Sequence, residues 1–231
     1  MPGLATCSLT GNTGYIGRCL IPLLRKRGHG VTALVRNGSQ HKLASDCNLR
    51  VGDALDGDSY AKHVSTFDTF IYLVGVPHPS PSNARQFVEI DLRAGSEAIR
   101  VAQQIGIPHF VYVSVAHPAP VMKSYIRVRR SCETALHEAG LSATILRPWY
   151  VLGPGHRWPV VLTPLYRLAE SFPATREAAA RLGFVSLDQM VNAIVSVTED
   201  PAQGVRIVEV PEIRSRGDAL CPRVAQASSG R

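Results

Sequence analysis

Residues 5–27 read ATCSLTGNTGYIGRCLIPLLRKR, and this stretch decides the fold. Its first part, Ala5 to Leu9, is a short run of small, β-branched and apolar residues of the kind that forms a buried strand. Its last part, Ile16 to Arg27, repeats apolar residues at helical spacing. Between the two lie three glycines: Gly11, Gly14 and Gly17. The stretch therefore predicts a strand, a glycine-rich turn and a helix in direct succession.

The rest of the sequence repeats this alternation of short strand-like runs and longer amphipathic stretches. Further strands are expected at Val31 to Val35, Leu49 to Val51, Thr69 to Val74, His109 to Ser114, Ala143 to Leu146 and Arg206 to Val210. Further helices are expected at Ser59 to Val64, Ala84 to Gln104, Ser124 to Ala139 and Leu187 to Thr198. Strands that alternate with helices favour parallel pairing through crossover connections. We therefore predict an α/β protein with a doubly wound parallel sheet.

Length and composition predict a single domain. The 231 residues, 45% of them hydrophobic, suffice for one sizeable core but not for two typical domains and a linker. We expect residues 1–213 to form this domain, with substrate-side elements mainly in a small C-terminal region, residues 153–213. From Arg214 onward the sequence is rich in Arg, Gly, Ser and Ala with little periodicity, so residues 214–231 are expected to form a flexible tail.

Several classes of protein are disfavoured by what the sequence lacks. No apolar run reaches the roughly 18 residues of a membrane span, so no membrane segment is expected. The first strand starts at Leu4 or Ala5, which leaves no room for a signal or transit peptide, so we expect a cytoplasmic protein. The five cysteines form no Cys-x-x-Cys pair and the eight histidines show no ligand spacing, so neither disulfides nor a metal site are expected.

The net charge of +7 raises nucleic acid as an alternative partner, because a basic face attracts phosphate backbones. The cations are mostly arginines spread along the expected helices, as at Arg25 to Arg27, with no aromatic residues interleaved. A solvated helix face explains this pattern. We therefore expect no nucleic-acid partner.

The glycine-rich turn has the features of a phosphate-binding loop. Gly11 would permit the tight turn, Gly14 the close approach of a phosphate, and Gly17 the packing of the helix on the strand. The helix that follows presents backbone N–H groups and the positive end of its dipole to an anion. The turn is therefore predicted to hold the diphosphate of a dinucleotide in a Rossmann-type fold through Gly11, Asn12, Thr13, Gly14, Tyr15, Ile16 and Gly17.

The segment from Thr10 to Gly17 resembles the Thr-Gly-x-Thr-Gly-[Phe/Tyr]-Ile-Gly fingerprint of the short-chain dehydrogenase/reductase superfamily, in its extended and atypical branches. Further matches follow in order: Val35-Arg36-Asn37, Gly52-Asp53, Val111-Tyr112-Val113-Ser114, Leu146-Arg147-Pro148 and, more weakly, Phe184-Val185-Ser186-Leu187-Asp188. The resemblance implies a nicotinamide dinucleotide as cofactor.

The residue after the second expected strand bears on which dinucleotide binds. Members of the superfamily that bind NAD carry Asp or Glu there, whereas this chain has Arg36. A guanidinium can bind a ribose 2′-phosphate with two donors, and Arg18 could assist, so NADP(H) is expected in preference to NAD(H). The alternative for Arg36 is an ordinary exposed arginine at a strand end. Cofactor contacts are also implied for Asp53, which could equally cap a turn, and for Val74, Gly75 and Pro148.

The resemblance further implies a catalytic serine at the end of the fifth strand and a Tyr-x-x-x-Lys pair on the next helix. The matching residues are Ser114, Tyr125 and, in the lysine's place, Arg129. Residues four apart share a helix face, so Tyr125 and Arg129 can act on one ligand. Tyr125 would exchange a proton with a substrate oxygen that Ser114 orients, while hydride passes to or from the nicotinamide. Arginine supplies a positive charge but differs from lysine in shape, which leaves catalysis open.

Substrate-side residues are expected in three segments that interrupt the alternation: Pro77 to Asn83, His117 to Lys123 and Gly153 to Leu182. Four residues are expected to help bind a small carbonyl or alcohol substrate: Trp149, Tyr150, His156 and Trp158. Each of them could equally be a residue of local packing. Two other functions stay open. One is a non-catalytic NADP(H)-binding regulatory or accessory protein, as in the NmrA-like regulators and the complex I accessory subunit of this branch. The other is a sugar-nucleotide epimerase or dehydratase, although such enzymes usually carry a larger C-terminal domain.

Overall fold

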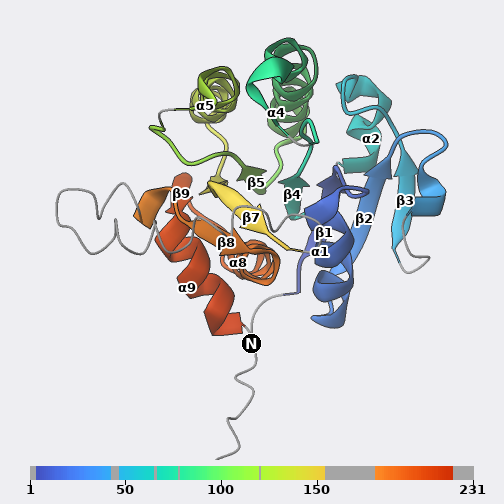
Figure 1. The fold of residues 1–231 in the computed structure, drawn as a ribbon. Helices are drawn as coiled ribbons and strands as arrows, with labels where there is room; N and C mark the ends of the chain where they lie inside the picture. Colours follow the sequence, from blue (N-terminus) through green and yellow to red (C-terminus); the bar gives the residue numbers. More distant parts are fainter. Residues whose placement is uncertain are drawn as a thin grey trace, which may run out of the picture.

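The computed structural model describes residues 4–42, 47–64, 67–77, 79–119, 121–153 and 180–220. Within these ranges a seven-stranded sheet, paired in parallel throughout, has the order β3-β2-β1-β4-β5-β6-β9 (Figure 1). Its strands are β1 (Thr6–Thr10), β2 (Gly30–Val35), β3 (Asn48–Val51), β4 (Thr69–Tyr72), β5 (His109–Val113), β6 (Ala143–Arg147) and β9 (Val205–Glu209). The strand order reverses between β1 and β4. This confirms the predicted doubly wound parallel sheet of the Rossmann type.

Helices cover both faces of this sheet (Figure 1). One face carries α1 (Tyr15–Lys26), α8 (Leu187–Glu199) and α9 (Val210–Leu220). The other face carries α2 (Ala61–Val64), α4 (Arg93–Ile105) and α5 (Lys123–Glu138). Short 3₁₀ turns lie in the connections at η1 (Gln40–Lys42), η2 (Gly57–Ser59) and η3 (Pro81–Asn83).

The helix expected over Ala84 to Gln104 is divided into three parts. A short helix, α3 (Ala84–Gln86), runs into a π-helical turn, η4 (Phe87–Leu92), and α4 follows. Asp91 lies in this turn, is buried, and accepts a hydrogen bond from the Val76 backbone N–H at 3.2 Å. A π turn adds one residue to a single turn without changing the apolar spacing on either side, so periodicity does not detect it.

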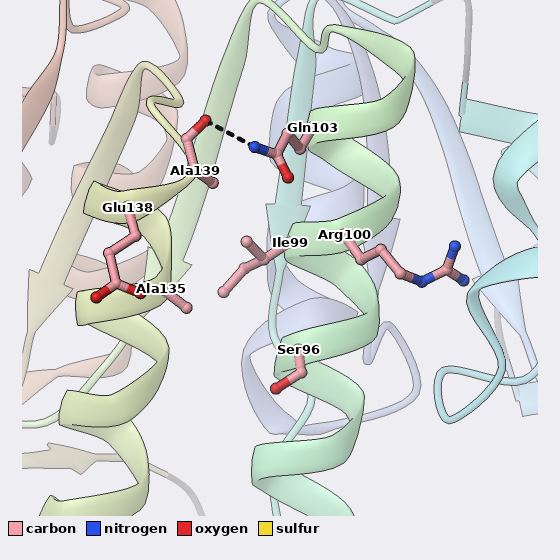
Figure 2. Close-up of a pocket in the computed structure, with 7 residues that line it drawn as sticks. All are labelled: Ser96, Ile99, Arg100, Gln103, Ala135, Glu138 and Ala139. Atoms are coloured by element: carbon pink, nitrogen blue, oxygen red, sulfur yellow. Dashed lines mark hydrogen bonds between the residues drawn. The ribbon is translucent and has the colours of Figure 1, made fainter.

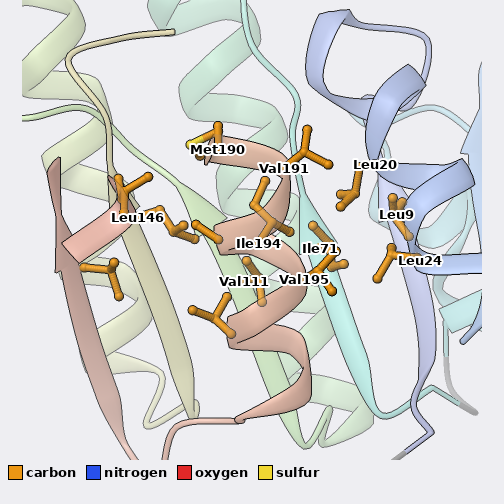
Figure 3. Close-up of a cluster of buried hydrophobic side chains, with 14 of the residues drawn as sticks. Leu9, Leu20, Leu24, Ile71, Val111, Leu146, Met190, Val191, Ile194 and Val195 are labelled. Carbon is orange, nitrogen blue, oxygen red and sulfur yellow. The ribbon is translucent and has the colours of Figure 1, made fainter. Parts of the chain in front are cut away.

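Two hydrophobic clusters, one on each face, hold the layers together. The cluster under α1 and α8 joins apolar residues of both helices to the central strands (Figure 3), among them Leu9, Leu20, Leu24, Ile71, Val111, Leu146, Met190, Val191, Ile194 and Val195. The cluster under α4 and α5 contains the buried aromatic residues Tyr60, Phe70, Tyr72, Phe110 and Tyr112. Burial on both faces explains why the central strands β4 (TFIY) and β5 (HFVYV) are rich in apolar and aromatic residues, whereas the edge strands β3 and β9 also contain charged residues.

The C-terminal part of the chain completes the main sheet. Strand β9 pairs with β6 from Ala143–Val205 to Arg147–Glu209, and α8 packs against the core. Much of the region expected on the substrate side therefore belongs to the sheet and its helical layer. A second, two-stranded parallel sheet is formed by β7 (Tyr150–Leu152) and β8 (Phe184–Ser186). Sequence analysis does not predict these strands, because three residues are too few to show an alternation.

The expected flexible tail begins too early in the sequence. Residues 214–220 lie in α9, in which Ile213 and Gly217 are buried. A Cβ on Gly217 would lie 2.5 Å from Cα of Gln189 in α8, so the two helices approach each other closely at the glycine. Because α9 packs on α8 through Gly217 and not through a large apolar side chain, the sequence shows no apolar periodicity here. This is why the segment is predicted to be a tail. Residues 221–231 lie outside the described residues.

Three features of the described residues bear on function. None of the described helices is both long and apolar enough to cross a membrane. The described residues contain no cluster of three or more His, Cys, Asp or Glu side chains that could hold a metal ion. Cys7 and Cys132 are buried thiols, and Cys19 is an exposed thiol.

Replacing Gly217 with Ala should destabilise the protein. Alanine favours helix by about 1 kcal/mol over glycine, but a Cβ 2.5 Å from the backbone of Gln189 must force α8 and α9 apart, at a cost of about 1–3 kcal/mol. We expect the second effect to win and the melting temperature to fall by a few degrees. The exposed Ser215→Ala in the same helix is the control, and its melting temperature should stay the same or rise. A gain in stability for Gly217→Ala would contradict the close contact.

Candidate functional site

The glycine-rich loop lies at the carboxyl end of β1, where the strand order reverses. Gly11 has a φ of +77°, and a Cβ there would lie 2.6 Å from the backbone of Leu73, just after β4. A Cβ on Gly17 would lie 2.6 Å from Cα of Asn12. Real Cβ atoms do not approach backbone atoms this closely. The loop, β4 and α1 can therefore converge only because these two residues lack side chains.

The N-terminus of α1 offers its backbone amides to an anion. Gly14 is the exposed N-cap residue, no side chain caps the helix, and its first turn contains no acidic residue. A Cβ on Gly14 would meet the Gly11 carbonyl oxygen at 3.1 Å. Thr13, Tyr15 and Ile16 are half-buried around the same turn. Uncapped amides, the helix dipole and space left by a glycine are what a diphosphate requires, so these residues fit a dinucleotide.

Two side chains brace the loop. Asn12 is 1% exposed, and its Nδ2 donates to the carbonyl oxygens of Leu9 at 2.8 Å and Leu34 at 2.9 Å. Arg18 is exposed, and its Nε donates to the Thr13 carbonyl oxygen at 2.9 Å. The loop is thus held in shape by the protein itself, with a guanidinium fixed at its edge.

Arg36 and Asp53 lie in exposed turns after β2 and β3. The Arg36 side chain makes no hydrogen bond or ion pair with another described residue, so its charge is available to a ligand. The Asp53 carboxylate accepts a hydrogen bond from the Leu55 backbone N–H at 3.0 Å. This is the turn-capping role that the sequence left open for Asp53.

The other expected cofactor contacts lie at the same edge of the sheet. Val74 and Gly75 follow β4, and a Cβ on Gly11 would lie 2.8 Å from the backbone nitrogen of Val74. Pro148 follows β6, and its carbonyl oxygen accepts a hydrogen bond from Ala116 at 3.0 Å. The carboxyl ends of parallel strands form the crevice where open α/β sheets bind ligands. The fold therefore gathers these residues and the loop at one edge.

Arg129 is buried and bound to the protein. Its guanidinium donates to the Asp91 carboxylate at 2.6 Å and to the carbonyl oxygens of Val74 at 3.3 Å and Val113 at 3.2 Å, just beyond β4 and at the end of β5. Burial raises the pKa of the Asp91 carboxyl, and the Arg129 guanidinium opposes this shift. The pair thus offsets the cost of removing two ions from water, and the charge of Arg129 is compensated inside the protein.

Tyr125 lies one turn before Arg129 on α5 and is half-buried. The guanidinium carbon of Arg129 lies 5.1 Å from the centroid of the Tyr125 ring, a cation–π distance. The ring also packs on Phe87, with centroids 5.0 Å apart. The structure therefore brings Tyr125 and Arg129 together on one helix face, with the cation over the ring.

Ser114 is buried, and its hydroxyl donates to the Glu133 carboxylate at 2.5 Å. Arg147 binds both oxygens of Glu133, at 2.5 Å and 3.1 Å, and Nε2 of His117 lies 3.3 Å from one of them. Burial alone would raise the Glu133 pKa, but hydrogen bonds from Arg147 and Ser114 outweigh it and hold the pKa below its ordinary value. Glu133 is therefore ionised at neutral pH, and the Ser114 proton is directed toward it.

The sequence predicts no role for three charged residues of this site. Asp91 and Glu133 contact the expected catalytic residues Arg129 and Ser114, and Arg147 contacts Glu133. Glu133 follows Tyr125 and Arg129 at intervals of four on the same helix, so spacing alone could have found it. Arg147 belongs to the quoted match after the sixth strand but received no function. Asp91 gives no local signal, because a π turn sets its place in the fold.

The expected substrate residues are described only in part. Trp149 packs against the cluster under α1 and α8. Tyr150 lies in β7, with its ring 6.3 Å from that of Phe184 in an edge-to-face arrangement. Both contacts are of the packing kind that the sequence left open. His156 and Trp158 lie outside the described residues.

Two hollows on the described surface lie away from the glycine loop. One, of about 300 Å³, lies between α4 and α5 (Figure 2) and is lined by Ser96, Ile99, Arg100, Gln103, Ala135, Glu138 and Ala139. The other, of about 360 Å³, lies between α1 and α8 and is lined by Cys19, Pro22, Leu23, Lys26, Asp188, Val191 and Asn192. Neither contains a residue of the expected site, and we assign no ligand to either.

Comparison with known sequences places this site in a family. The sequence model of a family described as NAD(P)H-binding matches residues 11–189. The chain is 26% identical over 213 residues to a ceramide reductase of Caulobacter vibrioides (strain NA1000 / CB15N), covering 91% of this chain and 65% of that protein. It is also 26% identical over 223 residues to a 3-diazoavenalumate denitrifying reductase of Streptomyces sp, covering 85% of this chain and 73% of that protein. The chain thus spans just under two thirds of the length of the ceramide reductase.

Solved structures agree on the fold. The enzyme WbmH of Bordetella bronchiseptica, in complex with NAD+, matches with a TM-score of 0.68 at 20% identity, covering 99% of this chain and 85% of that chain. UDP-N-acetylglucosamine 4-epimerase from Bacillus cereus matches with a TM-score of 0.66 at 15% identity, covering 92% of this chain and 84% of that chain. The resemblance to the short-chain dehydrogenase/reductase superfamily is confirmed, and the chain belongs to the NAD(P)H-binding family.

Proposed function

We propose that the chain is an NADP(H)-dependent oxidoreductase that transfers hydride to or from a small carbonyl or alcohol substrate. The observation that carries the proposal is a glycine-rich loop at the uncapped N-terminus of α1, together with two exposed arginines at the same edge of the sheet. Arg18 is fixed to the loop through Thr13, and Arg36 follows β2. The family match supports a nicotinamide cofactor, and the printed names of the two relatives, both reductases, support redox chemistry.

The charge of Arg36 is large enough to select the cofactor. Two unit charges 4 Å apart interact by about 4 kcal/mol at an effective dielectric constant of 20. Solvent and salt screen an exposed side chain, which leaves about 1–2 kcal/mol, or roughly tenfold in affinity. A guanidinium attracts a 2′-phosphate by this amount, whereas a carboxylate at the same position would repel it.

Tyr125 and Ser114 would transfer the proton and bind the substrate. When bound, the nicotinamide ring supplies or accepts the hydride. Tyr125 would move a proton between its hydroxyl and the substrate oxygen. Ser114 already donates its proton to Glu133, so its oxygen can only accept a hydrogen bond from a ligand, which favours binding of a substrate in its hydroxyl form.

A second function, a non-catalytic NADP(H)-binding regulatory or accessory protein, is favoured by the contacts of Arg129. Its charge is compensated by Asp91, and its terminal nitrogens also donate to the carbonyl oxygens of Val74 and Val113 and to the Tyr112 hydroxyl. It would therefore support a tyrosine anion less than an uncompensated cation would. Under this alternative the same cofactor binds, and Tyr125 serves only to pack against Phe87.

The cofactor assignment is tested by Arg36→Glu. We expect the wild type to bind NADPH about tenfold more tightly than NADH, and the variant to lose or reverse this preference, because a carboxylate repels the 2′-phosphate. Fluorescence titration with both reduced cofactors measures the two dissociation constants. Arg25→Glu makes the same charge change in the last turn of α1, away from the loop, and should leave the ratio unchanged. Equal affinities in the wild type would overturn the assignment.

The choice between enzyme and binding protein is tested by Tyr125→Phe. If Tyr125 transfers the proton, its loss should lower kcat by about 10²–10⁴-fold on a carbonyl substrate that the wild type reduces, because proton transfer is lost. The NADPH dissociation constant is the internal control and should not change. A wild type that binds NADPH yet turns over no member of a panel of small carbonyl compounds would support the non-catalytic function instead.

The Glu133 carboxylate should stabilise the site in a pH-dependent way. Glu133→Gln removes the charge bound by Arg147 and should lower the unfolding free energy at neutral pH by about 2–3 kcal/mol. The Glu133 pKa is depressed in the fold, so its contribution is complete above the unfolded value of about 4.3 and is lost as the pH falls through the folded value. The difference between wild type and variant should therefore shrink below about pH 4.

Urea denaturation over a pH series measures this difference. Glu138→Gln, an exposed change on the same helix, is the matched control and should alter stability by less than about 0.5 kcal/mol at every pH. A Glu133→Gln variant as stable as the wild type at neutral pH would show that the carboxylate does not hold this part of the site.

A further inference from the structure

We infer that Asn12 is a positioning residue that ties the phosphate loop to the strand carrying Arg36, and so contributes to the choice of cofactor. The inference rests on the proposed NADP(H) function and deepens it. From the sequence, Asn12 is expected only to contact the diphosphate. The inference adds an effect of Asn12 on recognition of the ribose 2′-phosphate.

The inference starts from the two hydrogen bonds of the Asn12 side chain. One joins Nδ2 to the carbonyl oxygen of Leu9 in β1, and the other joins it to the carbonyl oxygen of Leu34 in β2. Both acceptors are carbonyl oxygens, so the amide nitrogen must face them and the orientation of the amide is fixed. Oδ1 of Asn12 is buried and has no partner among the described residues, so the two donors are what the side chain contributes.

The position of Leu34 explains why a side chain is needed here. The ladder between β1 and β2 ends at the pair Thr10–Leu34. Beyond this pair β1 turns into the glycine loop, and Asn12 supplies from its side chain a donor that the strand no longer supplies. An aspartate would offer no donor when ionised, and an alanine would leave both buried carbonyl oxygens without this partner.

The contact bears on Arg36 through the end of β2. Arg36 comes two residues after Leu34, and between them the Val35 carbonyl oxygen accepts a hydrogen bond from Gly52 at 3.0 Å. The end of β2 is therefore held from the side of the loop by Asn12 and from the side of β3 by Gly52. Without the first bond the backbone at the end of β2, from which the Arg36 side chain extends, is held less firmly relative to the glycine-rich loop.

Asn12 is itself immobilised. A Cβ on Gly17 would lie 2.6 Å from Cα of Asn12, so the backbone of Asn12 lies directly beneath the first turn of α1. The residue thus connects the helix that faces the diphosphate with two strand ends. A group held by packing on one side and by two hydrogen bonds on the other can set a distance between parts of a ligand site.

A purely structural role and a positioning role predict different results. If Asn12 only keeps the loop in shape, its loss weakens the binding of NADPH and of NADH by the same factor. If Asn12 positions Arg36, its loss weakens the binding of NADPH more than that of NADH, because only NADPH carries the 2′-phosphate. The informative quantity is therefore the ratio of the two dissociation constants, which general loss of loop structure does not change.

The experiment is a double-mutant cycle with Asn12→Ala, Arg36→Ala and the double variant, each titrated with NADPH and NADH. We expect Asn12→Ala to reduce the preference for NADPH about fivefold to tenfold in the wild-type background. In the Arg36→Ala background, Asn12→Ala should weaken the binding of both cofactors by the same factor, since the side chain that Asn12 positions is absent. Gly217→Ala, a change away from the loop, controls for loss of stability and should keep the wild-type ratio.

An unchanged ratio in Asn12→Ala, with a clear preference in the wild type, would overturn this inference and leave the proposed function standing. No preference in the wild type would overturn the proposed cofactor selection, and this inference with it. If Asn12→Ala does not fold, Asn12→Ser retains one possible donor and should give an intermediate ratio; the wild-type ratio in that variant would again overturn the inference.

Discussion

The site depends on one constraint, the convergence of a loop, a helix and a strand end with no room for side chains between them. Gly11 meets the backbone after β4, and Gly17 meets the backbone of Asn12, at separations that exclude a Cβ. Because of this contact, α1 begins directly over the point where the strand order reverses. Its uncapped amides then point to the carboxyl edge of the sheet, where an anion can replace the missing cap.

Charges at this edge fall into two groups with different roles. Arg129 is buried and pairs with Asp91, and Arg147 is half-buried and pairs with Glu133 on α5, so both charges are compensated within the protein. Arg18 and Arg36 are exposed and lie beside the loop. In the proposed function a ligand with phosphate groups would meet the second group, while the first holds the surrounding elements in place. This division supports the proposed cofactor binding, and in the proposed oxidoreductase the proton transfer would fall to Tyr125.

Much of the fold could be predicted from local pattern, and the exceptions have physical causes. The strand expected at His109 to Ser114 is β5, His109–Val113, since β-branched and aromatic residues in a short run specify a buried strand. The same pattern cannot reveal a π turn, a three-residue strand or a helix that packs through Gly217. In the site, the spacing of the glycines was enough to locate the loop. The burial of Arg129 could not be predicted, because its ion-pair partner lies 38 residues away in the sequence.

The geometry around Arg129 also explains why this position is an arginine. Its acceptors are one carboxylate oxygen of Asp91, the carbonyl oxygens of Val74 and Val113, and the Tyr112 hydroxyl, and a planar fork of donors reaches all four. A lysine has a single nitrogen and could not span them. The residue in the motif's lysine position therefore has a structural reason for its identity that is independent of hydride transfer. A match at this position predicts the helix face, whereas the partners of the side chain determine its chemistry. Here those partners are Asp91 in the π turn and backbone carbonyl oxygens next to the ends of β4 and β5.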